Sequence, residues 1–211
     1  MQMDNFKFST LEYKRPDFAA FAALAEETKK RIESADSYGQ VRDAMLAYDE
    51  KGKLFNTDTT IAFIRHTLDT TDEFYDKENE YINNTFPTIM PQMLAVDEAL
   101  MNSPFRADYE KEFGRQCFAQ KELEKKSFCE ENIPLMQQEA KLTNEYQKIM
   151  ATAEISFDGK TLNLYGVQKH FEHEDREVRK GAARAYSEFS HKHEKRLEEI
   201  WDELIRIRNE M

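Results

Sequence analysis

Along most of the chain, apolar residues recur every three or four positions, which is the spacing of residues on one face of an α-helix. The first such stripe follows Asp17, a residue type that favours the N-cap position. Its members are Phe18, Phe21, Ala22, Ala25 and Ile32. The pattern therefore predicts a first helix that begins beside Asp17 and buries this stripe.

Cap and turn residues divide the following stretch into further predicted helices. Ser37 with Gln40 has the spacing of a capping box and predicts the start of a second helix. Gly52 predicts its end, because glycine favours the left-handed conformation that follows many helices. Thr57 is then expected to cap a third helix, whose apolar residues continue through Ile82.

Prolines and one glycine give the boundaries further along. Pro87 and Pro91 are expected to break or kink the third helix, since proline removes a backbone donor. Ser103 followed by Pro104 predicts a cap and a proline at the first helical position, and Gly114 predicts the end of that short helix. Two more helices are expected over residues 116–129 and 132–150.

In one segment the apolar residues recur at every second position instead of every third or fourth. Residues 153–164 alternate apolar and polar positions around Asp158–Gly159, a pair typical of a type I′ hairpin turn. Because an isolated hairpin is only marginally stable in water, we expect it to pack on a helix. The predicted fold class is therefore mostly α: a multi-helix N-terminal lobe of long antiparallel helices with one small β-hairpin near 153–164.

The last segment predicts a long helix with Asp175 at its N-terminal end, where a carboxylate interacts favourably with the helix dipole. Its apolar residues near one face are Val178, Ala182, Tyr186, Phe189, Leu197, Trp201, Leu204 and Ile205. This stripe continues almost to Met211 and needs a surface to cover it. We read it either as an interrupted element or as an ordinary C-terminal helix that docks on the core.

Composition narrows the class of protein. The 211 residues contain only six glycines and five prolines, which favours long helices, and the formal net charge is −11. Such a charge argues against a nucleic-acid partner, because phosphates attract basic surfaces. Two cysteines, Cys117 and Cys129, suggest a reducing compartment rather than a disulfide framework. No apolar run approaches membrane-spanning length, so we expect no membrane partner and a cytoplasmic location.

The sequence lacks the H-E-x-x-H motif of many zinc peptidases, in which two histidines one helical turn apart bind the metal. None of the five histidines has a second histidine four residues later; they are His66, His170, His173, His191 and His193. We therefore expect neither a catalytic nor a metal-binding residue in this chain.

Two clusters still contain potential metal ligands. One comprises His170, Glu172, His173 and Glu174, which we interpret as solvated charges around a helix start rather than a weak surface site. The other is the acidic run between Asp69 and Glu80, which lacks the glycine and the spacing of an EF-hand. A solvated or channel-lining helix face is the preferred interpretation of that run.

Five segments, in order, resemble the oligoendopeptidase F-type metallopeptidases, within the thimet oligopeptidase-like superfamily. They are Tyr13–Asp17, Ile64–Asn79, Ser103–Arg106, Ala151–Leu164 and Asp175–Lys180 with Ala182 and Tyr186. The resemblance implies a helical protein with a deep channel that admits short peptides and excludes folded proteins. It also implies a zinc ion held by H-E-x-x-H and a further glutamate, with the motif glutamate as general base.

All of those ligands would lie downstream of this stretch, so the resemblance transfers no catalytic or zinc-binding residue to it. It implies zinc in the full-length parent and none bound here. It divides the chain into an N-terminal helical domain, 1–152, and the hairpin with the first long helix of a truncated catalytic region, 153–211. We expect this portion to form part of the channel wall for short peptides and to be inactive alone.

Within the family-like segment, Arg65, His66 and Asp69 are the most distinctive polar residues. Asp69 follows Arg65 by four positions, so the two could pair along a helix. We interpret the three as a structural polar network, with direct contact to a bound peptide as the alternative.

A second function remains open. The chain could be a free-standing acidic helical protein that binds a partner through exposed apolar surface around Trp201. Because large uncovered apolar patches are unusual on monomers, we also expect self-association through the last helix.

Overall fold

The computed structural model describes residues 7–211, which are predominantly helical, as the sequence predicts. Their α-helices are α1 (Phe18–Glu33), α2 (Tyr38–Leu68), α3 (Glu73–Asn102), α4 (Arg106–Phe113), α5 (Arg115–Ser127), α6 (Ile133–Ala151), α7 (Leu164–Gln168) and α8 (Arg176–Glu210). Two short strands, β1 (Ile155–Phe157) and β2 (Lys160–Leu162), form an antiparallel hairpin. The mostly α fold class with one small hairpin is therefore confirmed.

Contacts group these elements into two compact units. Unit 1 comprises the described residues through Asp69 together with Phe74–Ile133, and unit 2 comprises Thr70–Glu73 and Pro134–Met211. By this criterion α6 groups with the hairpin and α8. The division into domains 1–152 and 153–211 was drawn from the resemblance, and its residues 1–6 lie outside the described chain, so it stays a prediction.

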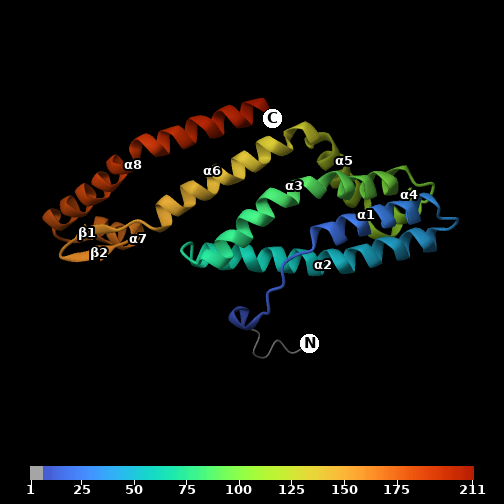
Figure 1. The fold of residues 1–211 in the computed structure, drawn as a ribbon, viewed down its shortest axis with the longest axis horizontal. Helices are drawn as coiled ribbons and strands as arrows, with labels where there is room; N and C mark the ends of the chain where they lie inside the picture. Colours follow the sequence, from blue (N-terminus) through green and yellow to red (C-terminus); the bar gives the residue numbers. More distant parts are fainter. Residues whose placement is uncertain (1–6) are drawn as a thin grey trace. The chain divides into compact units, whose positions relative to one another are not determined.

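Unit 1 is built around three long helices that reverse direction at each connection, with α4 and α5 following α3 (Figure 1). Asp17 caps α1 as predicted, because its side chain accepts a hydrogen bond from the Ala20 amide at 2.9 Å. One buried cluster joins all five helices; its members are Ala25, Ile32, Val41, Ala44, Met45, Val96, Ala99, Leu100, Tyr109 and Phe118. A second joins α1, α2 and α3 through Phe18, Phe21, Phe55, Ala62, Ile82 and Ile89.

The predicted break between a second and a third helix is wrong, because α2 runs without interruption through Gly52 and Thr57. Phe21 of α1 lies against Gly52 and stacks on Phe55, with ring centroids 4.3 Å apart. A glycine inside a helix costs about 1 kcal/mol, and burying these aromatic rings outweighs it. Thr57 is not a cap: its hydroxyl donates to the Lys53 carbonyl one turn earlier.

The capping box is also only partly correct. Ser37 occupies the N-cap position of α2, but its side chain makes no capping hydrogen bond. Gln40 reaches one residue further back and accepts from the Asp36 amide at 2.8 Å. The start of the helix was thus predicted correctly, and the pattern of bonds was not.

Neither Pro87 nor Pro91 breaks α3, which continues through both residues. Pro87 is itself buried on the face that packs in unit 1, so packing holds the helix together across the missing donors. At the next boundary α4 begins at Arg106, later than predicted, while the Ser103 hydroxyl still accepts from the Phe105 amide. Gly114 ends α4 with a φ of 90°, as predicted.

Unit 2 contains the hairpin, and the predicted turn is confirmed. Asp158 and Gly159 have φ values of 51° and 70°, and positive values at both positions are those of a type I′ turn. The hairpin packs on α7 and α8 as expected. A buried cluster joins them: Ala153, Ile155, Leu164, Val167, Ala182 and Phe189.

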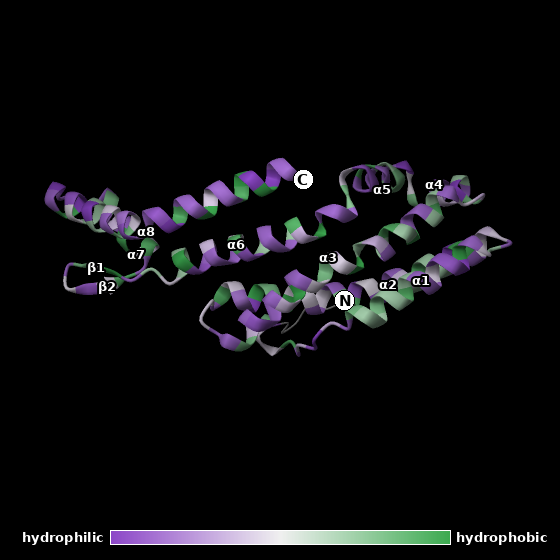
Figure 2. Cartoon of the chain, turned by 45° about the horizontal axis from the view of Figure 1, so that its top comes forward, coloured by the Kyte–Doolittle hydropathy of each residue, from purple (hydrophilic) through white to green (hydrophobic). Residues whose placement is uncertain are grey.

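Helices α6 and α8 run antiparallel beyond the hairpin (Figure 1). Arg196 of α8 donates to both carboxylate oxygens of Glu145 on α6, and Trp201 meets Tyr146 edge to face. Asp175 lies at the start of α8 as predicted, and its side chain also caps the helix by accepting from the Glu177 amide. Figure 2 shows hydrophilic residues over most of α8, interrupted by hydrophobic turns.

The predicted apolar face of α8 needs correction near its end. Its buried residues are Ala182, Phe189, Ile200, Leu204 and Ile207, whereas Trp201 and Ile205 are 48% and 55% exposed. The stripe therefore follows Ile200 and Ile207 rather than Trp201 and Ile205.

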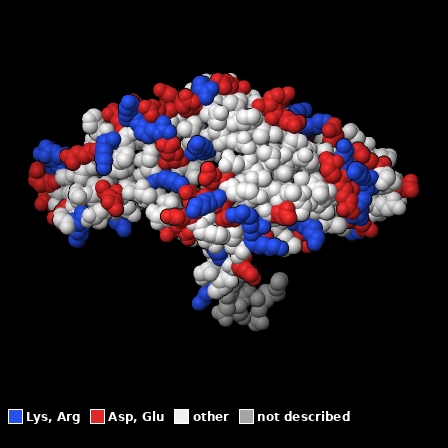
Figure 3. All heavy atoms as spheres, in the orientation of Figure 1, with Lys and Arg blue, Asp and Glu red and all other residues white. Residues whose placement is uncertain are grey.

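Charged residues of both signs are interspersed over the face that Figure 3 shows. No helix among residues 7–211 is long and apolar enough to cross a membrane.

The core of unit 1 yields a stability prediction. Replacing Leu100, which is fully buried, by alanine should lower the free energy of unfolding by about 2–5 kcal/mol, because it leaves a cavity. The matched change Leu54→Ala, at a side chain that is 63% exposed, should alter it by less than about 0.5 kcal/mol. Urea unfolding followed by circular dichroism measures both, and equal losses would show that Leu100 does not lie in the core.

Candidate functional site

Residues 11–17 join the short turn Phe8–Thr10 to α1 without regular secondary structure, and side chains of α2 and α3 hold them in place. We call residues 11–17 the N-terminal segment. Arg65 of α2 donates to the Leu11 carbonyl at one end of the segment. Glu78 of α3 binds Tyr13 and Arg15 in its middle. The polar residues singled out from the sequence lie around these contacts.

The carboxylate of Glu78 is buried, with 1% of the side chain exposed. It accepts from Arg15 Nε at 3.1 Å and 2.9 Å through its two oxygens, from Arg15 Nη2, and from the Tyr13 hydroxyl at 2.5 Å. A buried carboxylate is costly unless it is paired and hydrogen-bonded, and here it is both. We call Tyr13, Arg15 and Glu78 the Glu78 cluster.

The protonation states within the cluster follow from these contacts. Hydrogen bonds from Arg15 lower the pKa of Glu78, and the hydroxyl of Tyr13 acts in the same direction. Burial raises the pKa of Tyr13, and its hydrogen bond to the carboxylate raises it further. At neutral pH Glu78 is therefore an ionised acceptor and Tyr13 a protonated donor.

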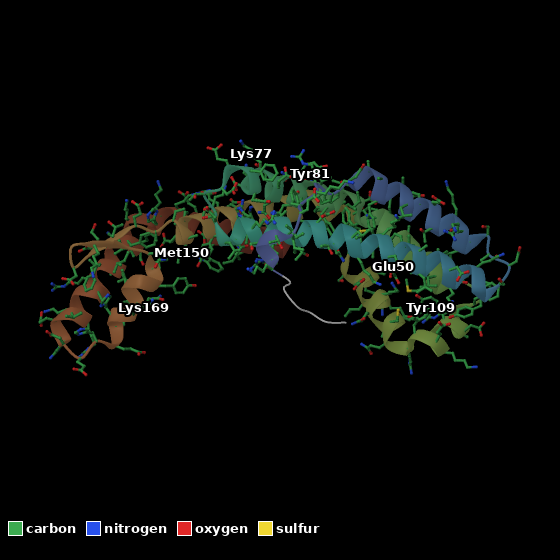
Figure 4. The ribbon with its side chains drawn as sticks, turned by 90° about the horizontal axis from the view of Figure 1, so that it is seen from below. Glu50, Lys77, Tyr81, Tyr109, Met150 and Lys169 are labelled. Carbon is green, nitrogen blue, oxygen red and sulfur yellow. The ribbon has the colours of Figure 1, made fainter. Side chains whose placement is uncertain are left out.

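Aromatic rings enclose the same region. The Arg15 guanidinium lies 4.9 Å from the ring centroid of Tyr81 on α3. Figure 4 labels Tyr81 one turn after Lys77, near the start of α1. Tyr81 also meets Phe18 of α1 edge to face, so the cluster connects directly to the apolar core of unit 1.

Arg65, the first of the predicted residues, links three parts of unit 1. Its guanidinium donates to the Tyr75 hydroxyl on α3 and to the Leu11 carbonyl. It also lies 5.3 Å from the Tyr75 ring centroid and 5.8 Å from that of Phe8, within the range of cation–π attraction. Tyr13 packs on Tyr75, so Arg65 adjoins the Glu78 cluster.

His66, the second predicted residue, is 1% exposed and faces α3. Its Nδ1 lies 3.8 Å from Oδ1 of Asp76, a residue of α3 that is mostly buried. Arg65 and His66 are adjacent on α2, and both join that helix to α3. A structural polar network and direct contact with a bound peptide both stay predictions for these residues.

Asp69, the third predicted residue, lies one position beyond the last helical residue of α2. It is the C-cap residue of α2, with extended backbone at φ −143° and ψ 95°, and it is exposed. Its amide donates to the Arg65 carbonyl at 3.1 Å. The helix ends at Leu68, and the side-chain pairing of Asp69 with Arg65 stays a prediction.

The role of Glu78 was not predicted from the sequence, where the residue belongs to the acidic run interpreted as a solvated or channel-lining helix face. A signal was present: Glu78 lies four residues before Ile82 and eleven before Ile89, in register with the buried stripe of α3. A carboxylate at a core position needs a cation, and the Tyr13–Asp17 segment contains Arg15. The long separation along the chain hid this pairing.

The residues described do not fit the zinc site that the resemblance implies. Within residues 7–211, no group of three or more histidine, cysteine, aspartate or glutamate side chains is placed to hold a metal. His173 instead accepts from the Asp175 amide at the start of α8, and His191 lies 2.7 Å from Glu194 on the same helix.

Comparisons with known proteins are consistent with the fold. A family model described as the peptidase M3 N-terminal domain matches residues 8–128. A solved structure named as an oligoendopeptidase F is 36% identical, with a TM-score of 0.92, over 97% of this chain and 36% of that one. No curated protein is significantly similar to the chain.

Two other solved structures give the same result. PZ peptidase A, solved with an inhibitor, is 34% identical with a TM-score of 0.92, over 96% of this chain and 36% of its own. A structure named as an oligoendopeptidase F from Bacillus anthracis is 29% identical with a TM-score of 0.93, over 97% and 38%. The chain therefore spans little more than a third of the length of the structures that it matches.

The Glu78 cluster yields a prediction about pH. Because the folded state lowers the pKa of Glu78, this carboxylate stabilises the fold above its unfolded pKa of about 4.3, and the contribution is lost as pH falls through the folded value. Glu78→Gln should lower the free energy of unfolding at pH 7 by about 1–3 kcal/mol. The difference from the parent should shrink below about pH 4.

Urea unfolding at a series of pH values measures this difference. The matched control is Glu203→Gln, which removes an exposed carboxylate bound to Arg206 and should cost less than about 1 kcal/mol. A difference between Glu78→Gln and the parent that is constant from neutral to acidic pH would show that the carboxylate does not stabilise the fold through its charge.

Proposed function

The chain belongs to the peptidase M3 family, and from this premise we propose that it is the non-catalytic N-terminal part of a zinc-dependent oligoendopeptidase that hydrolyses short peptides. The carrying observation is the similarity to oligoendopeptidase F structures over nearly the whole chain. Those structures are almost three times as long as the matched stretch. The remaining part of such a protein has room for a catalytic centre.

The zinc ligands belong, in this proposal, to sequence outside these 211 residues. Two observations on potential zinc ligands support this. The five histidines lack the H-E-x-x-H spacing, and no cluster of three or more potential ligands forms among residues 7–211. A zinc ion in such peptidases supplies Lewis-acid activation of water and of the peptide carbonyl. The residues of this chain contribute no group to that chemistry.

The contribution of this chain is to shape the substrate channel. Unit 1 offers rigid helices, and the ties made by Arg65, His66 and the Glu78 cluster hold α2, α3 and the N-terminal segment in one arrangement. Rigid walls are what a channel needs to admit short peptides and exclude folded proteins. Asp69 is exposed at the end of α2 and is the predicted residue best placed to meet a ligand. We place the enzyme in the cytoplasm.

A second candidate function, binding through exposed apolar surface on α8, has one observation in its favour. Trp201 and Ile205 lie one turn apart and are about half exposed, beside the buried Ile200 and Leu204. Apolar pairs of this kind can join two copies of a helix. We therefore retain the proposal that the chain self-associates through α8.

The first prediction here concerns hydrolysis. The purified chain should not cleave a quenched fluorescent peptide, with or without added zinc, because it lacks the ligands and the general base. The reading frame that encodes these residues should also encode an H-E-x-x-H helix, and its product should cleave the peptide in a chelator-sensitive reaction. A variant of that product with glutamine for the motif glutamate is the matched control and should be inactive. Chelator-sensitive cleavage by the 211 residues alone would overturn the proposal.

The second prediction concerns self-association of the chain. Sedimentation velocity over a wide range of protein concentration should show a dimer of the chain that Trp201→Glu weakens by about tenfold or more, equivalent to about 1.4 kcal/mol. Tyr165→Glu is the control, because Tyr165 is 77% exposed but lies in α7. A monomer at every concentration would contradict this prediction.

A further inference from the structure

Unit 2 contains a cavity that the proposed channel wall does not explain. It has a volume of about 510 Å³ and lies between the last turns of α6, strand β1 and the middle of α8. Met150, labelled in Figure 4, marks the end of α6 beside it. This volume falls within the range of small-ligand sites.

One wall of the cavity is an unpaired strand edge. Residues Glu154, Ile155 and Ser156 line it, and β1 pairs only with β2, in the register Ile155 with Leu162 and Phe157 with Lys160. Antiparallel ladders alternate, and the two-residue turn makes Phe157 and Lys160 a hydrogen-bonded pair. The amide and carbonyl of Ser156 therefore point away from β2. Within residues 7–211 neither group has a main-chain partner.

The floor of the cavity is apolar. Ile155 and Phe189 are 4% and 9% exposed and belong to the buried cluster of unit 2, and Ile149 packs against that cluster. Ala185 completes the floor on α8. An apolar side chain placed here would remove further hydrocarbon surface from water, worth about 25 cal/mol per Å².

The charged residues around the cavity indicate which kind of ligand it can bind. The lining carries Glu154 and Glu188 together with Lys148 and Lys192, and its third glutamate, Glu145, is bound by Arg196. The charges therefore nearly balance, and no excess of positive charge is present to attract a phosphate or another anion. Lys192 and Glu188 enter no ion pair with the described residues. A neutral main chain with an apolar side chain therefore suits the site better than a nucleotide or a polyanion.

We propose that an extended peptide of about three residues binds in this cavity as an added strand on the free edge of β1. Its main chain pairs with Ser156, and an apolar side chain rests on Phe189. The length follows from three consecutive residues that line the cavity along this edge, Glu154 and the β1 residues Ile155 and Ser156, at about 3.4 Å per residue. The proposal rests on the proposed function in one respect: a peptidase that takes short peptides supplies ligands of this kind.

The test is a titration of the isotope-labelled 211-residue chain with the blocked tripeptide acetyl-Thr-Phe-Thr-amide, followed by amide chemical shifts in nuclear magnetic resonance. We expect saturable shifts at Ser156 and Phe189. Two further probes carry one methyl group, on the phenylalanine nitrogen or on the following threonine nitrogen. Because strand groups alternate in direction, one methylation should weaken binding at least tenfold and the other should not.

A matched pair of variants tests the protein side. Ser156→Pro removes the edge amide that faces the cavity, and Thr161→Pro removes the amide directly opposite, on the outer edge of β2. Neither amide bonds across the hairpin. Ser156→Pro should weaken peptide binding at least tenfold, and Thr161→Pro should leave it unchanged. Should Ser156→Pro unfold the hairpin, the two methylated peptides still decide the question, because they leave the protein intact.

Absence of shifts at Ser156 and Phe189 at the highest soluble peptide concentration would overturn the proposal. Equal binding of both methylated peptides, or shifts confined to unit 1, would overturn it as well. Concentration-dependent shifts at Ser156 without peptide would assign the edge to a second copy of the chain instead. The titration involves neither zinc nor hydrolysis, so its failure removes this site and leaves the peptidase proposal to its own assay.

Discussion

The arrangement of unit 1 depends on one buried charge. Among the residues that the structure describes, Glu78 is the only buried carboxylate, and its burial is tolerable because Arg15 and Tyr13, 63 and 65 residues earlier in the chain, bind it. That requirement fixes the N-terminal segment against α3. The segment leads directly into α1, whose Phe18 and Phe21 enter the core shared with α2 and α3. Arg65 and His66 add ties between α2 and α3 beside the same point.

Features set by neighbouring residues could be predicted from the sequence. The cap at Asp17, the position of Asp175 at a helix start, the helix end at Gly114 and the Asp158–Gly159 turn each follow from local backbone and side-chain chemistry, and each is confirmed. Features that depend on packing between distant residues could not be predicted from the sequence. Gly52 by itself is a signal for a helix end, yet α2 continues through it where the ring of Phe21 packs against it. The role of Glu78 was hidden for the same reason, because its partner lies far away in the sequence.

Unit 1 and unit 2 differ in how their polar groups are used. In unit 1 the buried Glu78 carboxylate has its partners within the fold, which suits a rigid wall. In unit 2 the hairpin leaves the outer groups of β1 without a main-chain partner along a cavity with an apolar floor. The chain belongs to the peptidase M3 family, and within that family we propose that the first unit shapes the substrate channel and that the second binds an extended peptide. Among residues 7–211, no group of three or more potential ligands is placed to hold a metal, and His173 makes a local contact at the start of α8.

The central claim is that these residues belong to a zinc peptidase without holding its metal. Anomalous X-ray scattering at the zinc edge, recorded from crystals of the protein encoded by the complete reading frame, tests this most directly. The account predicts a tightly bound zinc ion whose protein ligands all lie outside residues 1–211. A zinc ion held by three side chains of these residues, or no zinc in an active preparation, would contradict it.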